Sequence, residues 1–258
     1  MTHIQLLAAA VLAILAATAL ATDVDEVWVL PAADTPIDKE SAPDWAKDHP
    51  DLLIDLTALR SAYPAQFRRV ERRPKGIFLH PVDAEPILYD DGKAKTPEEA
   101  IENADVQDSL AQIYPLGPVA RRIAPWFDPG RARSEPMLKA LFGADKTSVA
   151  ATAARIDFCG RRISFSGRQN AAGKLAEISE EIEAAIAKDP KLRPYVSSLG
   201  GTLNWRFIAG TKRLSSHAWG AAIDLNPDLG AYWKWKPESG LRSIAAPQAW
   251  MRGVSCRR

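Results

Sequence analysis

One ten-residue segment constrains this chain more than any other feature of its sequence, because it specifies a turn that leads into a strand. The segment has the form Ser215-x-His217-x-x-Gly220-x-Ala222-x-Asp224. Glycine at position 220 permits a tight reversal between the histidine and the aspartate. We expect a strand over residues 221–225, with Ala222 and Asp224 on the same face. The pattern therefore predicts an imidazole in a loop and a carboxylate on the following strand, close enough to share one metal ion.

Histidines are scarce, and this limits any metal site. Catalytic zinc sites commonly use three protein ligands drawn from His and Asp/Glu, with a fourth position left for water. The two cysteines cannot form a four-thiolate zinc site. His49 and His80 each adjoin a proline, and we expect both to be solvated imidazoles in loops. The remaining histidines are His3, near the N-terminus, and His217, which is the only one in a motif with metal-ligand character.

The segment resembles the M15 family of zinc D-Ala-D-Ala carboxypeptidases and related peptidoglycan endopeptidases. Its signature is complete, with Ser215, Gly220 and Ala222 as supporting positions. As in one branch of that family, Arg206 and a Gly-Thr-x-x-Leu-Ser segment at 210–215 precede the histidine. The resemblance extends from about residue 158 to residue 237. It implies an α+β fold of the Hedgehog/DD-peptidase type, with a largely helical N-terminal extension.

The resemblance also implies roles for three residues. His217 and Asp224 would bind Zn²⁺, and Arg206 would hold the substrate carbonyl or the developing oxyanion, which suits a planar and permanently charged group. In such enzymes zinc polarises the scissile carbonyl and lowers the pKa of its bound water to about 7. A nearby carboxylate takes the proton from that water and delivers it to the leaving amine. The expected substrate is the peptide stem of bacterial peptidoglycan.

The sequence departs from the family downstream of this segment. The family supplies its third zinc ligand and its general base from an Asp/Glu-x-x-His segment, but no histidine follows His217 here. Residues 246–258 form an arginine-rich tail without amphipathic periodicity. We hypothesise that the reading frame is shifted or truncated near Ala245, and that zinc is held weakly. Asp228 and Glu238 are the nearest carboxylates, and we expect both to be solvated.

An apolar run from Leu6 to Leu20 predicts the location of the protein. Its 15 residues fall short of the ~20 that span a bilayer as a helix, which suits a signal peptide cleaved after Ala21. The alternative is an uncleaved N-terminal anchor. We expect export to the periplasm or beyond, and no stable membrane span after cleavage. In that oxidising compartment Cys159 and Cys256 either form a disulfide or remain two unpaired thiols.

The net charge of the chain limits its possible partners, and two alternatives to a peptidase remain open. The 33 basic and 32 acidic side chains give a net charge of +1, which does not favour a nucleic-acid partner. A non-catalytic peptidoglycan-binding protein is the alternative to a peptidase. A third option is a broken gene product without a stable fold, because an absent last strand leaves a sheet edge uncovered.

The order of elements divides the chain into four parts: a signal peptide (1–21), an extension (22–150), a peptidase module (151–245) and the tail (246–258). Residues 23–50, rich in Pro and Asp, are expected to be irregular.

Five of the eight tryptophans fall between positions 205 and 250, and we favour packing over sugar stacking for them. Lys212 and Arg213 are expected to be solvated or to steer carboxylates. The periodicity predicts helices over 51–62, from Thr96, over 134–142 and over 170–188, and strands at 77–79 and 87–89.

Overall fold

The computed structural model describes residues 26–32, 34–112 and 130–229. They fall into two compact units, one ending at Ala94 and one beginning at Lys95. Both units contain helices and strands, which confirms an α+β chain. The predicted signal peptide (1–21) and tail (246–258) lie outside the described residues, and the predicted boundary between residues 150 and 151 stays a prediction.

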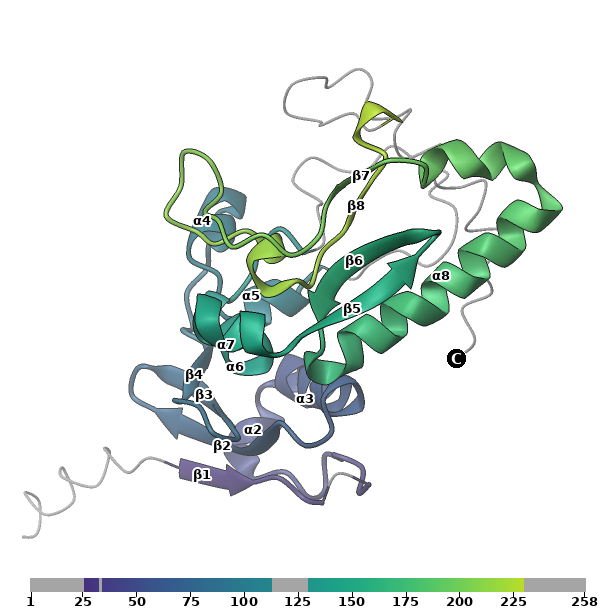
Figure 1. Ribbon diagram of the computed structural model, residues 1–258. Coiled ribbons are helices and arrows are strands. Elements are labelled where there is room, and N and C mark those ends of the chain that lie inside the picture. The colour runs from purple at the N-terminus through teal and green to yellow at the C-terminus, as the bar shows by residue number, and fades with distance from the viewer. Residues whose placement is uncertain (1–25, 33, 113–129, 230–258) are drawn as a thin grey trace, which may run out of the picture. The chain divides into compact units, whose positions relative to one another are not determined.

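The first unit contains a four-stranded antiparallel sheet in the order β1 (Glu26–Val29), β2 (Phe67–Arg73), β3 (Gly76–Pro81), β4 (Ile87–Asp90) (Figure 1). The strands predicted at 77–79 and 87–89 are confirmed. Gly76 begins β3 with a φ of 127°, and a Cβ there would lie 2.2 Å from the Asp90 carbonyl oxygen. Only glycine accommodates that approach.

Two helices belong to the same unit, α2 (Asp44–Lys47) and α3 (Pro50–Ala62). The predicted helix over 51–62 is confirmed, with Leu52, Leu56 and Leu59 buried. The Tyr89 hydroxyl of β4 donates a hydrogen bond of 2.9 Å to the Asp55 carboxylate of α3. This bond and the buried leucines place the core of the unit between α3 and the sheet.

Two expectations for this unit are wrong. Residues 23–50 are not irregular throughout, because they include β1 and α2, whose Trp28 and Trp45 are buried. β1 and α2 have four residues each, which is too short for a periodic pattern of apolar residues. The sequence therefore contains no signal for these two elements. His80 is not a solvated loop residue. It lies in β3, is buried, and its Nε2 is 2.5 Å from Glu71 Oε2.

The second unit begins with four short helices, α4 (Pro97–Glu102), α5 (Val106–Leu110), α6 (Glu135–Phe142) and α7 (Lys146–Ala151), of which α4, α5 and α7 have a side-chain capping box at the N-terminal end. The predicted start at Thr96 is confirmed: its hydroxyl accepts from the Glu99 N–H and the Glu99 carboxylate accepts from the Thr96 N–H. This reciprocal pair satisfies two backbone donors that the helix leaves free. The predicted helix over 134–142 is confirmed as α6, which ends at Gly143.

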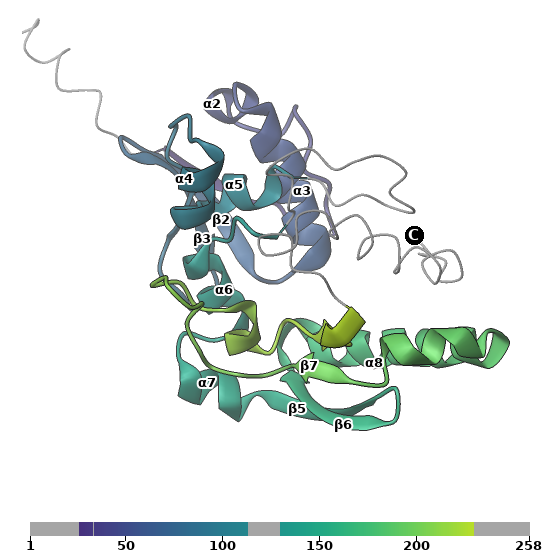
Figure 2. The ribbon, with the colours of Figure 1, turned by 90° about the horizontal axis from the view of Figure 1, so that it is seen from above.

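An antiparallel hairpin, β5 (Ala153–Phe158) and β6 (Arg161–Ser166), packs against the longest helix, α8 (Ala171–Lys188) (Figures 1 and 2). The predicted helix over 170–188 is thus confirmed. Ile178 was expected on its apolar face but is 45% exposed. Ser179 is buried in its neighbourhood instead, where its hydroxyl accepts from the Cys159 N–H at 2.8 Å. Cys256 lies outside the described residues, so the disulfide stays a prediction.

Beyond α8 the chain forms β7 (Leu199–Gly201) and β8 (Asp224–Leu225), an antiparallel pair. The 3-10 turns are η1 (Arg168–Asn170), η2 (Pro190–Tyr195), η3 (Ser216–Trp219) and η4 (Pro227–Leu229). The strand expected over 221–225 is shorter than predicted, because β8 covers only Asp224–Leu225. Ala222 therefore lies before the strand and not on its face. In the described part of the chain, we find no helix with the length and apolarity needed to cross a membrane.

Candidate functional site

His217 lies in η3, a single turn that the local sequence stabilises. The Ser215 hydroxyl, at the N-terminal end of the turn, accepts from the His217 N–H at 3.4 Å. At the other end, the Gly220 N–H donates to the His217 carbonyl at 3.1 Å. The Asn204 N–H donates to the same carbonyl at 2.8 Å. The backbone of His217 is therefore fixed from three directions, and its side chain is buried.

Gly220 performs the reversal that the sequence predicts. Its φ of 60° is in the left-handed region, where side chains with a Cβ are disfavoured. A Cβ there would also lie 3.0 Å from the Ser166 backbone nitrogen. The Ser166 N–H donates to the Gly220 carbonyl at 2.9 Å, which joins the turn to β6. Glycine is thus required both by the backbone conformation and by the close approach of β6.

The two nitrogens of the His217 ring face different partners. Nδ1 lies 2.8 Å from the Thr202 carbonyl oxygen. Because a carbonyl only accepts, Nδ1 carries the proton of this hydrogen bond. Nε2 lies 3.3 Å from Asp224 Oδ2, and in the neutral ring it presents a lone pair toward that oxygen. Two lone pairs in this position are stabilised by a cation between them, either a proton on Nε2 or a metal ion.

The separation of these two atoms suits zinc. Zinc binds histidine nitrogen at about 2.0–2.1 Å and carboxylate oxygen at about 2.0–2.2 Å, so tetrahedral ligands lie about 3.4 Å apart. A backbone carbonyl at the second ring nitrogen is also the usual outer partner of a metal-bound histidine. The Asp224 side chain is 56% exposed, which leaves the site open to solvent and substrate. The described residues thus supply two suitable zinc donors.

Arg206 lies on a hairpin that leads directly into this turn. Its carbonyl accepts from the N–H of Ser215, the residue immediately before η3, at 3.0 Å. Its side chain is exposed, and within the described ranges no hydrogen bond or ion pair joins the guanidinium to another residue. An exposed guanidinium without a partner among the described residues is available to a ligand, and the role of Arg206 stays a prediction.

Sequence reasoning missed the backbone beneath the site. The Thr202 carbonyl leaves no signal in a sequence, because every residue has one. Gly200 was a detectable signal. A Cβ at Gly200 would lie 3.0 Å from Asp224 Cβ, whereas one at Gly201 would make only an ordinary contact, 3.8 Å from His217 Nδ1. Glycine at position 200 lets β7 pass close to Asp224.

Two expectations about neighbouring residues are resolved. Arg213 is not solvated: its side chain is 15% exposed, and its Nη2 donates to the Arg131 carbonyl at 2.9 Å. Trp219 is buried and packs edge-on against half-buried Trp205, at 6.4 Å between ring centroids, so packing explains these two residues. The other three tryptophans of the 205–250 region lie outside the described residues.

No third donor completes the site within residues 26–32, 34–112 and 130–229, where no other His, Cys, Asp or Glu forms a close group with His217 and Asp224. His49 and His80 belong to the first unit. Asp228 is exposed in η4, as expected for a solvated carboxylate, and Glu238 is outside the described residues.

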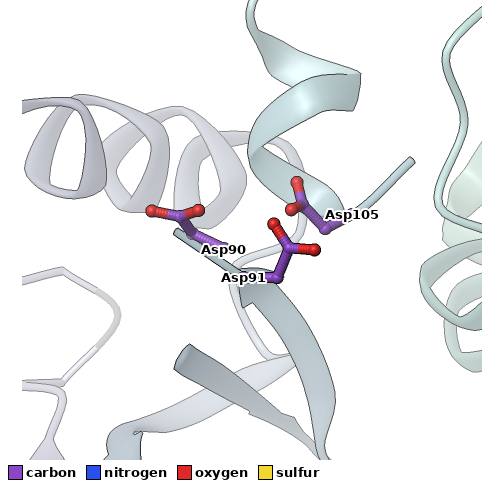
Figure 3. A group of neighbouring side chains, drawn as sticks. All are labelled: Asp90, Asp91 and Asp105. Atoms are coloured by element: carbon purple, nitrogen blue, oxygen red, sulfur yellow. The ribbon is translucent and has the colours of Figure 1, made fainter. Parts of the chain in front are cut away.

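Three aspartates elsewhere in the chain are drawn in Figure 3. Asp90 ends β4 and Asp91 follows it in the first unit, whereas Asp105 precedes α5 in the second. Asp90 accepts from the Gly92 N–H at 2.7 Å, and Asp105 accepts from the Asp108 N–H at 2.9 Å and forms an ion pair with Lys95 at 2.7 Å. These are an ordinary turn bond, a helix-capping bond and an ion pair within the protein, so we assign no metal to these residues.

The comparison with known families agrees with the motif. Residues 209–252 match the D-alanyl-D-alanine carboxypeptidase family, a peptidase family of the M15 group. The matched segment contains Ser215, His217, Gly220 and Asp224, and it extends past Ala245. It indicates a peptidase of the D-Ala-D-Ala carboxypeptidase kind. No curated protein and no solved structure matches the chain.

Proposed function

We propose that this protein is an exported, zinc-dependent peptidase that hydrolyses the peptide stems of bacterial peptidoglycan, built on a Hedgehog/DD-peptidase fold. One observation supports it above the others: His217 Nε2 and Asp224 Oδ2 lie 3.3 Å apart, within a segment that matches a peptidase family. His217 and Asp224 are the proposed zinc ligands, and Arg206 is the proposed substrate-binding residue. Ser215 and Gly220 support the turn, and Ala222 is the third supporting position of the motif.

Each of these residues has a distinct task in the proposal. Bound zinc supplies Lewis-acid chemistry and an activated water at neutral pH. Thr202 holds the proton on Nδ1 and so keeps Nε2 available as a ligand. Arg206 places a fixed positive charge against the substrate carbonyl, where it stabilises the negative charge that develops on oxygen. Because the Ser215 N–H donates to the Arg206 carbonyl, the backbone of Arg206 is attached to the turn that carries the ligand histidine.

A non-catalytic peptidoglycan-binding protein is the second candidate. It is favoured by the finding that the described residues bring two zinc donors together rather than three. Such a protein would use Arg206 to bind stem-peptide carbonyls or carboxylates without hydrolysis. Loss of catalysis with retained binding is its signature.

The test compares release with binding for the full chain. Purified protein is incubated with zinc and a synthetic stem peptide ending in D-Ala-D-Ala, and with isolated sacculi. Free D-Ala or new stem fragments that disappear in His217→Ala and Asp224→Asn support a peptidase. Binding without release supports the second candidate, whereas absence of both overturns the two proposals.

A matched pair of arginine variants tests the role of Arg206. Arg206→Lys keeps the charge but loses the planar donor group, and we expect it to lower either turnover or stem-peptide affinity about tenfold or more. Arg155→Lys makes the same change at an exposed position of β5 and should leave both unchanged. Equal behaviour of the two variants would remove Arg206 from the proposal.

A further inference from the structure

The hairpin that carries Arg206 has one buried backbone donor that it cannot satisfy internally. Phe207 and Leu214 form an antiparallel bridge. The hydrogen bonds beside it run from Ile208 N–H to the Arg213 carbonyl and from Ser215 N–H to the Arg206 carbonyl. Phe207 and Leu214 are therefore a non-hydrogen-bonded pair, whose N–H groups point away from the hairpin. Leu214 is 5% exposed, so its N–H needs an acceptor from elsewhere.

Glu135, the first residue of α6, supplies that acceptor. The Leu214 N–H donates to Glu135 Oε2 at 3.2 Å, across 79 residues of sequence. The other oxygen, Oε1, is paired with Lys139 at 2.9 Å, one turn further along α6. The two oxygens of the carboxylate thus have separate partners, and the bond to Oε2 is the one that reaches the hairpin.

The opposite end of α6 holds the same segment a second time. Trp219 is buried, and its Nε1–H donates to the carbonyl of Gly143, the residue that ends the helix, at 3.1 Å. Leu214 and Trp219 lie on either side of His217 in the sequence. The two ends of α6 therefore attach to the chain before and after the candidate zinc ligand.

From this arrangement we propose that Glu135 is a positioning residue for the site. Its carboxylate fixes the Leu214 amide and thereby sets the hairpin that presents Arg206 and leads into the His217 turn. Its effect on catalysis rests on the proposed peptidase function, but its effect on the hairpin does not. In this proposal Glu135 acts through the Leu214 amide and not as a zinc ligand.

Four variants of the full-length protein separate the hydrogen bond from the charge of Glu135. Glu135→Ala removes the acceptor, and Glu135→Asp keeps the charge but withdraws the carboxylate by one methylene. Glu135→Gln removes the charge and keeps an acceptor oxygen. Lys139→Gln removes the ion pair alone. If Glu135→Ala does not fold, Glu135→Asp still tests the loss of the hydrogen bond.

Amide hydrogen exchange gives a readout that does not depend on activity. In Glu135→Ala and Glu135→Asp we expect exchange at the Leu214 and Ser215 amides to accelerate about tenfold or more, as expected when a buried donor loses its acceptor. Amides in the middle of α8 should exchange as in the wild type. Glu135→Gln and Lys139→Gln should stay within about threefold of the wild type at all of these amides. Unchanged exchange at Ser215 in both the Ala and the Asp variants overturns the proposal.

Kinetics connect the hairpin to the proposed function. If the wild type hydrolyses the D-Ala-D-Ala stem peptide, Glu135→Asp should lower kcat more than it raises KM, because Arg206 acts mainly on charge in the transition state. Glu135→Gln should restore kcat. Equal kcat values for wild type and Asp variant contradict the positioning role. A wild type without hydrolysis contradicts the proposed function instead, and the exchange experiment still decides the role of Glu135.

Discussion

His217 Nε2 lies 3.3 Å from Asp224 Oδ2, while Nδ1 of the same ring lies 2.8 Å from the Thr202 carbonyl oxygen. The imidazole is therefore held from one side by backbone and faces a carboxylate on the other. This relationship makes the two residues a paired donor set, and it supplies the first prediction.

Zinc binding should depend on both residues of this pair. We expect His217→Ala and Asp224→Ala each to weaken zinc affinity by more than the 10–100-fold that loss of an outer partner typically costs, because each removes a coordinate bond. The measurement is competition against a chromophoric zinc chelator. His49→Ala, in the first unit, is the control and should bind zinc as the wild type does.

The absolute affinity is a separate expectation. The described residues supply two zinc donors, and two donors hold zinc more weakly than three, so we expect the wild-type chain to lose its zinc on dialysis against a mild chelator. Metal analysis before and after dialysis measures this loss. One zinc per chain that survives dialysis contradicts it and indicates a third ligand.

Replacement of Gly220 should destabilise the second unit. Gly220→Ala places a Cβ in the left-handed region and 3.0 Å from the Ser166 nitrogen, so we expect a loss of more than about 2 kcal/mol in the free energy of unfolding. Gly210→Ala is the matched control, because Gly210 has a φ of 76° with nothing within 4 Å of its Cβ position. It should lose only about 1–2 kcal/mol. Urea unfolding followed by circular dichroism compares them, and equal losses would show that contact with β6 is unimportant.

Trp219→Phe tests the attachment to the end of α6. The substitution keeps an aromatic ring but removes the Nε1–H that donates to the buried Gly143 carbonyl, so we expect about 1–3 kcal/mol of destabilisation. Trp205→Phe, at the half-buried partner ring, should cost less. Circular dichroism is the suitable probe, since fluorescence changes with every tryptophan removed. A smaller loss for Trp219→Phe than for Trp205→Phe contradicts the assignment.

Glu71 in the first unit predicts a dependence of stability on pH. Arg73, which donates to the carboxylate at 2.6 Å, and then His80 lower its pKa from 4.5 in the folded state. A lowered folded-state pKa means that its contribution is present above about pH 4.5 and lost as the pH falls through the folded value. Glu71→Gln should therefore reduce the loss of stability between pH 6 and pH 3.

The control for this experiment is Glu26→Gln, which removes an ion pair to Arg72 in which both side chains are more than 40% exposed. Exposed pairs contribute little, so its unfolding curve should follow the wild type at each pH. Thermal unfolding across that pH range compares the three proteins. Parallel curves for Glu71→Gln and wild type would contradict the prediction.

Sequence patterns predicted the helices that are long enough to repeat the helical spacing of apolar residues, or that begin with a recognisable cap. The leucines of α3, the isoleucines of α8 and the capping box at Thr96 are local signals, and each element lies where it was expected. Ile178 was expected to be buried and is exposed, and β1 and α2 were not expected at all. In each case burial depends on which other parts of the chain cover the residue. Arg213 shows the same effect: its sequence context is polar, but the Arg131 carbonyl and Glu102 lie beside it.

By itself, the sequence determined the chemistry available: one histidine, one aspartate and a glycine turn at a spacing that matches a peptidase family. The tertiary structure alone decided what holds them. The Thr202 carbonyl orients the imidazole, Glu135 satisfies the Leu214 amide, and Gly143 accepts from Trp219. A sequence shows side-chain types at local spacings, whereas these three contacts join backbone groups to residues 15 to 79 positions away. Which donor meets which acceptor over that separation is settled only when the chain packs.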